Sequence, residues 1–514
     1  MASVVNSSSH NASVRDRDGG AGAAAVTYLF TRGFHPLVRR RPPRTPQAKR
    51  VFFSASADSC LTTRANVSAM PLLRVIVLTS ISYSSAAFTA SYIGGFACRG
   101  GLTAGPGFMA LDGDALIVSR FTGDPLESDD VASVQNFTAL LAAGRVANAT
   151  CGTVAHVTWP NDVEPATASL GAHGVVSALL APGGFLVPPK TIGAVTLLNS
   201  TRGAPASASF VLSAPKVLPG DGWFYHRAFF YDVDKDGRDD VIAARAVKPL
   251  IGAATGELVW FKQPSVDDPL AASALPWADA PLATGAWAPD VLFAQPISLR
   301  GDADEQLLFT SFFTGGGLGL LQCAGCSKSG ANAWATADLE RIVLDASIGP
   351  AFDVAVVDIN GDGRLDVLVT NHADNATTVN GTVFQSVVAV YEAPLAPTPL
   401  TDAAAWKKHV VLNGMAVREP GPNQAAPGAA RAFAPPAGTA SSRPWISVSG
   451  DGDQRAYVLV PNTADPSDWT YTINEVHDCK GTVGRQVSVV VDSASYLVIP
   501  CYDSGRIEVY ELQE

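Results

Sequence analysis

Asp232-Val-Asp234-Lys-Asp236-Gly237-Arg-Asp-Asp240 and Asp358-Ile-Asn360-Gly-Asp362-Gly363-Arg-Leu-Asp366 share one pattern, D-x-[DN]-x-D-G-x-x-D. Oxygen side chains at positions 1, 3, 5 and 9 can surround one hard cation, and glycine at position 6 permits the sharp turn. Calcium, which takes roughly six to eight oxygen ligands, fits such a set better than magnesium, which keeps most of its own water. Position 7 adds a main-chain carbonyl oxygen in loops of this kind. The predicted calcium ligands are Asp232, Asp234, Asp236, Arg238 and Asp240 in the first loop, and Asp358, Asn360, Asp362, Arg364 and Asp366 in the second.

The flanks of both loops predict strands. An EF-hand would need a bidentate Glu at position 12, but Ala243 and Val369 stand there. Short runs of β-branched and aromatic residues precede and follow each loop, so each loop joins two strands. The two loops resemble the FG-GAP/VCBS repeat, the calcium-loop blade of integrin alpha-subunit propellers and of many secreted propeller proteins. The alternative is an Asp/Gly turn that holds no ion and is favoured by local hydrogen bonds.

Weaker copies of the same outline recur along the chain. Residues 297–310 lie midway between the two loops and carry non-ligand side chains at the ligand positions, namely Ser298, Arg300 and Gln306. Further copies begin at Leu111, Ser447 and Val487, and strand-like runs within 178–198 supply a seventh unit. Self-similarity at a fixed period with short strands is typical of a propeller. The sequence therefore predicts an all-β, seven-bladed β-propeller over 91–514, with six or eight blades as alternatives and 416–444 as an extended Pro/Ala-rich loop on one blade.

The front of the chain differs from this body. Residues 1–69 carry a net charge of +7, which leaves −18 for the remainder. We interpret 1–69 as a basic leader, either disordered or an extension of the gene model, and 70–90 as a signal peptide or signal anchor with Ser85-Ala-Ala87 as the cleavage candidate. A membrane association is expected only if 72–97 stays uncleaved as an anchor, and an organelle transit peptide is a further alternative. The acidic body argues against nucleic acid as a partner.

Cysteines and glycosylation sequons favour an oxidising, extracellular compartment. Removal of the leader, with Cys60, leaves an even set of six cysteines, of which Cys323–Cys326 and Cys479–Cys501 are predicted pairs. Zinc binding by Cys323 and Cys326 is the alternative, but no second Cys/His pair has zinc-ligand spacing. The five sequons of the body lie at Asn136, Asn148, Asn199, Asn375 and Asn380. The expected product is a secreted glycoprotein or, alternatively, a membrane-anchored one with its propeller facing outward.

The face opposite the loops is the predicted ligand site. Counting outward along the two strands from each loop reaches a set of polar and aromatic residues: Trp223, His226, Arg245, Asp353, Asn371 and His372. Decayed repeats add Asp290, Ser311 and Trp445 at comparable offsets. Such residues around a channel mouth suit a sugar or a small anion. The alternative is that the tryptophans belong to the core and the histidines are structural.

Two functions follow from the resemblance. One is a calcium-binding propeller that binds a protein or glycan ligand. The other is a carbohydrate-active enzyme, similar to sugar or polysaccharide lyases, in which a His/Arg pair would accept a proton and stabilise a carboxylate or carbonyl. No G-x-S-x-G elbow, phosphate loop, dinucleotide fingerprint or H-E-x-x-H is present in the sequence. The sequence therefore assigns no catalytic residue.

Overall fold

The computed structural model describes residues 88–186, 189–199, 208–213, 222–249, 252–327, 330, 332–374, 378–379, 382–420, 424–439 and 441–514. The chain divides into residues 1–81, which lie outside the described residues, and a second unit, 82–514, which holds the fold. The predictions for the leader, for Cys60 and for the signal segment up to residue 87 therefore lie outside the described residues, as do the sequons at Asn375 and Asn380.

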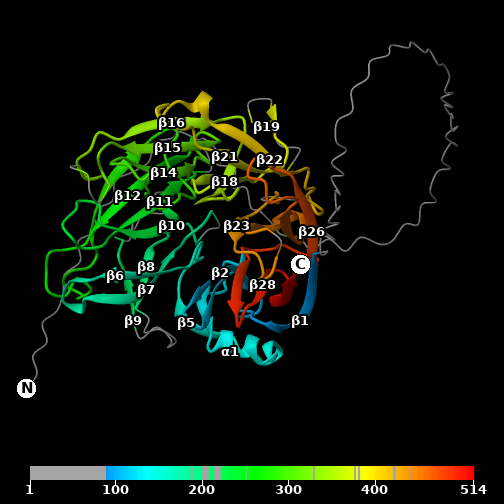
Figure 1. Cartoon of the computed structure of the whole chain (residues 1–514). Coiled ribbons are helices and arrows are strands. Elements are labelled where there is room, and N and C mark those ends of the chain that lie inside the picture. The colour runs from blue at the N-terminus through cyan, green and yellow to red at the C-terminus, as the bar shows by residue number, and fades with distance from the viewer. Residues whose placement is uncertain are drawn as a thin grey trace, which may run out of the picture. The chain divides into compact units, whose positions relative to one another are not determined.

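The second unit is an all-β, seven-bladed β-propeller, as predicted. Its sheets follow one another around a central axis (Figure 1), and each blade is antiparallel. The first three blades contain β2 (Gly105–Asp112), β3 (Ala115–Phe121), β4 (Asp130–Val134) and β5 (Gly152–His156); β6 (Glu164–Ser169), β7 (Val175–Pro182), β8 (Val195–Asn199) and β9 (Ala208–Val211); and β10 (Phe224–Tyr231), β11 (Asp240–Val247), β12 (Thr255–Lys262) and β13 (Ala278–Thr284).

In every blade the strands are given from the axis outward. Blade four is the exception described below, because its first named strand is not the innermost segment. Blades four to seven contain β14 (Glu305–Thr310), β15 (Leu318–Cys323) and β16 (Glu340–Asp345); β17 (Ala351–Val357), β18 (Asp366–Asn371), β21 (Val387–Glu392) and β22 (Lys407–Asn413); β23 (Ala430–Phe433), β24 (Trp445–Ser449), β25 (Arg455–Pro461) and β26 (Tyr471–Asp478); and β27 (Val487–Val491), β28 (Ala494–Cys501), β29 (Arg506–Gln513) and β1 (Thr89–Ala97). In blade four, the innermost position is held by a segment that only bridges β14, through the pairs Phe293↔Phe309 and Ile297↔Gln306.

Short elements decorate the blades. They are α1 (Phe137–Ala142), the small hairpin of β19 (Thr378–Val379) and β20 (Thr382–Val383), and the 3-10 turns η1 (Val146–Asn148), η2 (Gly171–His173), η3 (Ala403–Ala405) and η4 (Asp451–Asp453).

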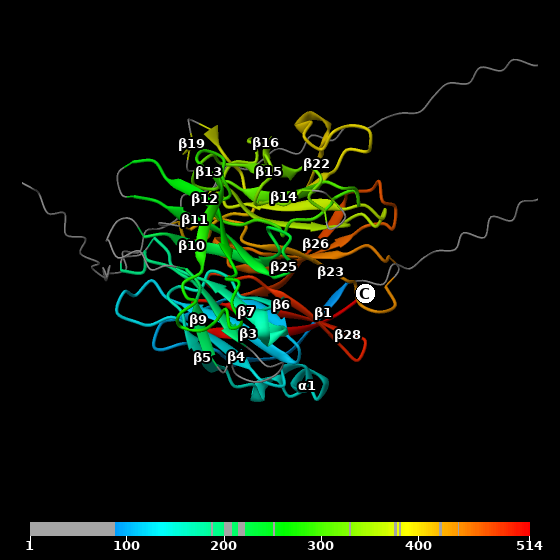
Figure 2. The same cartoon turned by 90° about the vertical axis from the view of Figure 1, so that its left-hand side faces the viewer.

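The two ends of the propeller meet in one blade. The first strand, β1, pairs antiparallel with β29, so that blade seven takes its outermost strand from the start of the domain and its other three from the end. Both views show the blue β1 beside the red C-terminal strands (Figure 1, Figure 2). This pairing closes the ring, because it joins blade seven to the segment that leads into blade one.

Each blade is covered on both faces by its neighbours. The buried apolar residues form seven clusters, one for each interface between consecutive blades, including the interface of blades seven and one. In β18, Asp-Val-Leu-Val-Thr-Asn, all six residues are buried, which explains why the strand shows no alternation of polar and apolar residues. The seven interface cores are the main source of stability, because apolar burial dominates folding.

The loop between the two innermost strands of a blade defines one face of the propeller, here called the loop face. It carries both predicted calcium loops, between β10 and β11 and between β17 and β18. The predicted copies at Leu111 and Val487 are the corresponding hairpins of blades one and seven.

Blade six differs from its prediction in two respects. The predicted copy at Ser447 corresponds to the second hairpin of the blade and not to its innermost hairpin. The Asp451-Gly-Asp453 turn joins β24 to β25, on the face opposite the loop face. The stretch 416–444 is not one extended loop either, since it contains β23, the innermost strand of the blade.

Three disulfides link Cys98–Cys151, Cys323–Cys326 and Cys479–Cys501, so both predicted pairs are confirmed. Disulfides persist in oxidising compartments, which supports an extracellular environment. Within the described ranges, the structure has no helix that is long and apolar enough to cross a membrane.

Candidate functional site

The first acidic loop, 232–240, brings its carboxylates together. Single carboxylate oxygens of Asp232, Asp234 and Asp240 all lie within 4.8 Å of one another. The loop is shaped by its own N–H groups, since those of Asp236 and Gly237 donate to Asp232 at 3.1 and 3.0 Å. Asp240 is buried and accepts the N–H of Val233 at 3.2 Å, which ties the end of the loop to its beginning.

The second acidic loop, 358–366, repeats these backbone hydrogen bonds. Asp358 accepts the N–H groups of Asp362 and Gly363 at 3.2 and 2.9 Å, and Asp366 accepts that of Ile359 at 3.0 Å. The side chain of Arg364 binds Asp362 in this loop, with Nε at 3.1 Å, and that of Arg238 binds Asp236 in the first loop. The arginine at position 7 therefore places positive charge beside the carboxylate at position 5 in both loops.

The two loops differ in the strand that flanks them. Lys262 pairs with Asp234 and lies 3.9 Å from Asp236, so an ammonium group already sits at the first loop. In the second loop's blade, Glu392 of the adjacent strand is paired with Asp366. In the first loop's blade, Lys262 directly follows Phe261, the partner of Val241, and so lies at the corresponding end of its strand. Glu392 contacts Arg364 at 3.1 Å, so the second loop has an additional carboxylate where the first has a cation.

The donor set fits a hard divalent cation. Burial raises the pKa of Asp240 to about 6 and that of Asp366 to about 7, because a buried carboxylate loses its hydration. Nearby carboxylates add to the shift of Asp366. The side chains at the ligand positions of both loops offer carboxylate and amide oxygens, which are the donors that a hard divalent cation prefers over nitrogen and sulfur.

The face opposite the loop face carries a row of aromatic rings around the channel mouth. Consecutive ring centroids lie 4.7 to 6.2 Å apart across blades seven, one, two, three, four and five. Most of these side chains are partly exposed. In order, the row contains Tyr502, Phe121, Trp159, Phe185, Phe224, Phe313, Phe312, Phe352 and His372.

Local backbone geometry turns this row toward the mouth. The register of the innermost hairpin shifts at the same level in blades one, three and five, where Phe108, His226 and Phe352 lie. Such β-bulges re-aim a side chain and are common beside binding sites. In blade four the turn is made by Asp290, whose carboxylate accepts the N–H groups of Phe312 and Phe313 at 2.7 and 2.8 Å.

His226 lies directly behind the aromatic row. It is 5% exposed, packs edge-on against Phe185 and Phe224, and neither ring nitrogen has a hydrogen-bond partner among the described residues. Burial lowers its pKa to about 3, so the ring is neutral at physiological pH.

The structure brings only some of the predicted ligand-face residues to the mouth. His372 stacks on Phe352 at 4.9 Å and pairs with Asp451 of blade six at 3.1 Å. Asn371 is buried and uses its side chain to hold the backbone of Ile348, Gln385 and Val387. Ligand binding by Asn371 therefore remains a prediction that these contacts do not favour.

Trp223 and Arg245 lie elsewhere. Trp223 belongs to the core between blades two and three, and the Arg245 guanidinium stacks on it at 4.5 Å. Arg245 also pairs with Glu257 at 2.6 Å and Asp279 at 2.9 Å. Ligand binding by Trp223 and Arg245 remains a prediction that this placement does not favour. Trp445 is likewise part of the core between blades six and seven.

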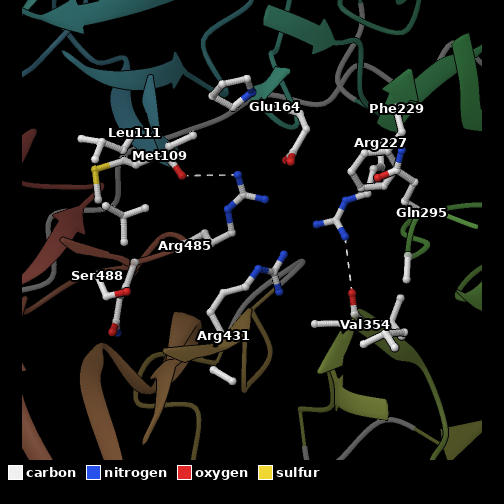
Figure 3. A pocket seen from close by; sticks show the side chains of 18 of the residues that line it. Met109, Leu111, Glu164, Arg227, Phe229, Gln295, Val354, Arg431, Arg485 and Ser488 are labelled. Carbon is white, nitrogen blue, oxygen red and sulfur yellow. Dashed lines mark hydrogen bonds between the residues drawn. The ribbon is translucent and has the colours of Figure 1, made fainter. Parts of the chain in front are cut away.

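The central channel contains a cavity that sequence reasoning missed. Its volume is about 610 Å³, and innermost segments of all seven blades line it. Three arginines point into it, Arg227, Arg431 and Arg485, together with Glu164 (Figure 3). A repeated tripeptide could have revealed two of them, because Arg227-Ala-Phe229 and Arg431-Ala-Phe433 occupy the innermost strands of blades three and six.

Comparisons with known proteins agree with the repeat. Residues 351–391, which run from β17 to β21 and include the second loop, match the FG-GAP repeat, so the chain carries an FG-GAP repeat within its seven-bladed propeller. No curated protein sequence matches this chain.

Several solved propellers and carbohydrate-related proteins show a distant likeness. The Dos1 propeller is 12% identical, with a TM-score of 0.38, over 82% of this chain and 95% of its own. Polysaccharide lyase Uly1 is 10% identical, with a TM-score of 0.34, over 79% and 88%. A lectin of Aleuria aurantia in complex with alpha-methyl-L-fucoside is 8% identical, with a TM-score of 0.33, over 75% and 96%.

Proposed function

We propose that this protein is a secreted, calcium-stabilised β-propeller that binds a glycan at the channel mouth opposite its loop face. The observation that carries the proposal is the aromatic row from Tyr502 to His372, which spans six blades and keeps most of its rings partly exposed. Partly exposed rings with a few fixed polar groups are the usual lining of a small-molecule site. A protein ligand is the other occupant that such a face accepts.

Polar groups at the mouth supply the orientation that apolar stacking lacks. The His372–Asp451 pair lies at the end of the row, and both side chains are partly exposed. A sugar that stacks an apolar face on a ring would direct its hydroxyl groups to such side chains.

Calcium is the proposed cofactor. Asp232, Asp234, Asp236 and Asp240 would hold one ion, and Asp358, Asn360, Asp362 and Asp366 a second. Each ion would supply positive charge to carboxylates that otherwise repel one another. It would thereby stabilise the innermost hairpin of its blade, blade three or blade five. Arg238 and Arg364 would contribute through their main chain, while their side chains hold the carboxylate at position 5.

Secretion is supported by the disulfides and by two exposed sequons. Asn136 and Asn148 are both solvent-exposed, as a glycosylated asparagine must be. The basic leader and the segment 70–90 are proposed as the export signal, with a membrane anchor as the alternative if that segment is not cleaved.

A glycan-binding screen of the secreted protein, with acidic and neutral glycans, tests the proposal. We expect retention of at least one glycan, and a loss of about tenfold or more in affinity for Phe313→Ala, which removes a partly exposed ring of the row. Tyr92→Ala is the matched control, since Tyr92 is a 54% exposed aromatic residue on the outermost strand β1. Equal affinity of both variants would place the glycan elsewhere, and no retention of any glycan would contradict the proposal.

A carbohydrate-active enzyme of the lyase type is the second candidate. It is favoured by His226, beside Arg227, because neither of its ring nitrogens has a hydrogen-bond partner among the described residues, so that one could take a proton from a ligand. The burial that lowers the pKa of His226 makes it a weaker base than an ordinary histidine, so the bound substrate would have to raise that pKa. The same screen distinguishes the two functions through unsaturated products. An enzyme would form them and lose turnover in His226→Gln, whereas a binding protein would retain glycans without forming any.

A further inference from the structure

The central cavity is lined by an alternating series of charges, of which all but Arg431 are buried. Asp162 lies 2.6 Å from Arg485 and 3.0 Å from Arg227, and Asp353 lies 3.4 Å from Arg227 and also pairs with Arg431. The series Arg485–Asp162–Arg227–Asp353–Arg431 thus links blades seven, two, three, five and six. Three guanidinium groups share two carboxylates, which leaves one positive charge uncompensated within the series.

The arginines are not equally occupied. Arg227 contacts both carboxylates and the carbonyl of Phe293 at 3.3 Å, so its donors are largely used. Arg431 makes both of its hydrogen bonds through Nη1, to Asp353 and to the carbonyl of Ala430. Its Nε and Nη2 donate to none of the residues that the structure describes.

Arg485 leaves donors free in the same way. Its contacts with Asp162 and with the carbonyls of Met109 and Val163 all run through Nη2. Nε and Nη1 donate to no residue of the described ranges. The side chains of Arg431 and Arg485 both reach the middle of the cavity (Figure 3). These donors face the space of the cavity, and two guanidinium groups that converge on one space can together hold an acceptor with several oxygens.

The remaining charge on the lining is Glu164, whose carboxylate faces the arginines (Figure 3). Burial and the charge of Asp162 raise its pKa above the ordinary value. Burial, together with the charges of Arg227 and Arg485, lowers the pKa of Arg431 despite its pairing with Asp353.

We propose that the central cavity binds a small oxyanion, a carboxylate or sulfate group on a molecule of monosaccharide size or smaller, through Nε and Nη2 of Arg431 and Nε and Nη1 of Arg485. Guanidinium groups bind both kinds of oxyanion in bidentate geometry. The volume of about 610 Å³ lies within the range of ordinary ligand sites. The site is distinct from the aromatic row and does not depend on a glycan at the mouth.

Calorimetric titration of the secreted protein with sodium sulfate, sodium glucuronate and glucose, at constant ionic strength, tests the proposal. We expect at least one of the two anions, sulfate or glucuronate, to bind. If glucuronate binds, neutral glucose should bind at least about tenfold more weakly than glucuronate. Arg431→Gln should weaken the binding about tenfold or more. We expect this variant to fold, because Asp353 keeps its contacts with Arg227 and with the N–H of Ala430 at 3.2 Å. Arg341→Gln is the control of equal charge, because Arg341 is exposed and contacts the carbonyls of Thr284 and Ala286.

Glu164→Gln provides an independent test should Arg431→Gln fail to fold. It has the same shape and removes negative charge from the lining, so we expect tighter anion binding at pH 8, where the carboxylate of the unmodified protein is ionised most fully. The proposal is wrong if neither anion binds, if Arg431→Gln and Arg341→Gln bind equally, or if Glu164→Gln leaves the affinity for the anion unchanged.

Discussion

His226 illustrates how one residue can set the acid stability of a large domain. Its ring is buried between Phe185 and Phe224 and stays neutral, with a pKa of about 3, whereas the unfolded chain would show the ordinary value of about 6.5. Between these two values the unfolded state binds a proton that the folded state does not. The stabilising effect of the neutral ring is therefore complete above the unfolded pKa and is lost progressively as the pH falls toward 3.

Replacement of His226 by Phe should remove this sensitivity. With calcium in excess, the unmodified protein is expected to lose about 2 kcal/mol of unfolding free energy from this residue between pH 7 and pH 5. His226→Phe should not show that loss, because it keeps the ring contacts and cannot be protonated. Urea unfolding at both pH values measures the difference. His372→Phe is the control, and an equal loss in His226→Phe and the unmodified protein would contradict the expectation.

Single residues also show where the sequence was informative. Counting from the calcium loops reaches His372 in the aromatic row and His226 directly behind it, because both loops fix the register of their strands. The sequence did not predict Arg431 and Arg485 as site residues, because blades six and seven have no acidic calcium-type loop from which to count. Trp223 and Arg245 had the right distance along the strand but point between the blades, because successive side chains of a strand face opposite sides.

At the scale of elements, the two calcium hairpins have the same loop but different neighbours. Lys262 pairs with Asp234 beside the first loop, and Glu392 occupies the equivalent position beside the second. An ammonium group competes with a cation for the same carboxylates, whereas an extra carboxylate adds to their field. We therefore expect the second loop to bind calcium more tightly.

Calcium removal should destabilise the propeller mainly through the second loop. At a hundredfold excess over the dissociation constant, one ion adds about 2.7 kcal/mol, and a chelator removes this contribution. Asp362→Ala should abolish more of the chelator-induced shift in melting temperature than Asp236→Ala. Lys262→Gln should enlarge the shift by freeing Asp234. A melting curve that is unchanged by chelator in the unmodified protein would show that neither loop binds a stabilising ion.

Elements were predicted well where turn chemistry marked them. The Asp/Gly loops identified the innermost hairpins of blades three and five, and the Asp-Gly and Asp-Ser turns near 112 and 492 those of blades one and seven. The predicted hairpin of blade six was wrong by one strand, because Asp451-Gly-Asp453 resembles a loop-face turn but joins the next pair of strands. Its innermost strand, β23, is only four residues long and lies in a Pro/Ala-rich stretch, so periodicity could not reveal it.

At the scale of the whole molecule, one disulfide supports the closure of the ring. Cys98 follows β1 of blade seven, and Cys151 precedes β5 of blade one, at a sequence separation of 53. Cys323–Cys326 spans a separation of 3. The chain entropy removed from the unfolded state grows with the loop, to roughly 4 kcal/mol for the first and under about 2 kcal/mol for the second.

Removal of these disulfides should therefore have unequal effects. The double variant Cys98→Ala, Cys151→Ala should lose more stability than the double variant Cys323→Ala, Cys326→Ala, although the two cysteines of the second pair are the more deeply buried. Chemical unfolding of both variants, without reductant, measures the difference. A larger loss in the second variant would mean that local packing outweighs the constraint on the unfolded chain.

The start of the mature chain is a prediction for the molecule as a whole. Because β1 begins at Thr89, cleavage after Ala87 would leave the closing strand intact. N-terminal sequencing of the native protein should therefore find a start near Phe88 on a glycosylated product. An intact Met1 or Ala2 on an unglycosylated cytosolic protein would end the secretion hypothesis, and an intact start on a membrane glycoprotein would indicate the anchor.

The pairing of β1 with β29 also sets the order of events on the ribosome. β1 is the first strand of the propeller to be synthesised and β29 the last, so β1 has no backbone partner until the chain is complete. An unpaired edge strand is a template for pairing with other chains. Cys98 and Cys151 emerge early, within blade one, and their bond can hold the waiting strand against that blade. We expect the oxidation of this one pair to decide how much of the nascent protein escapes aggregation.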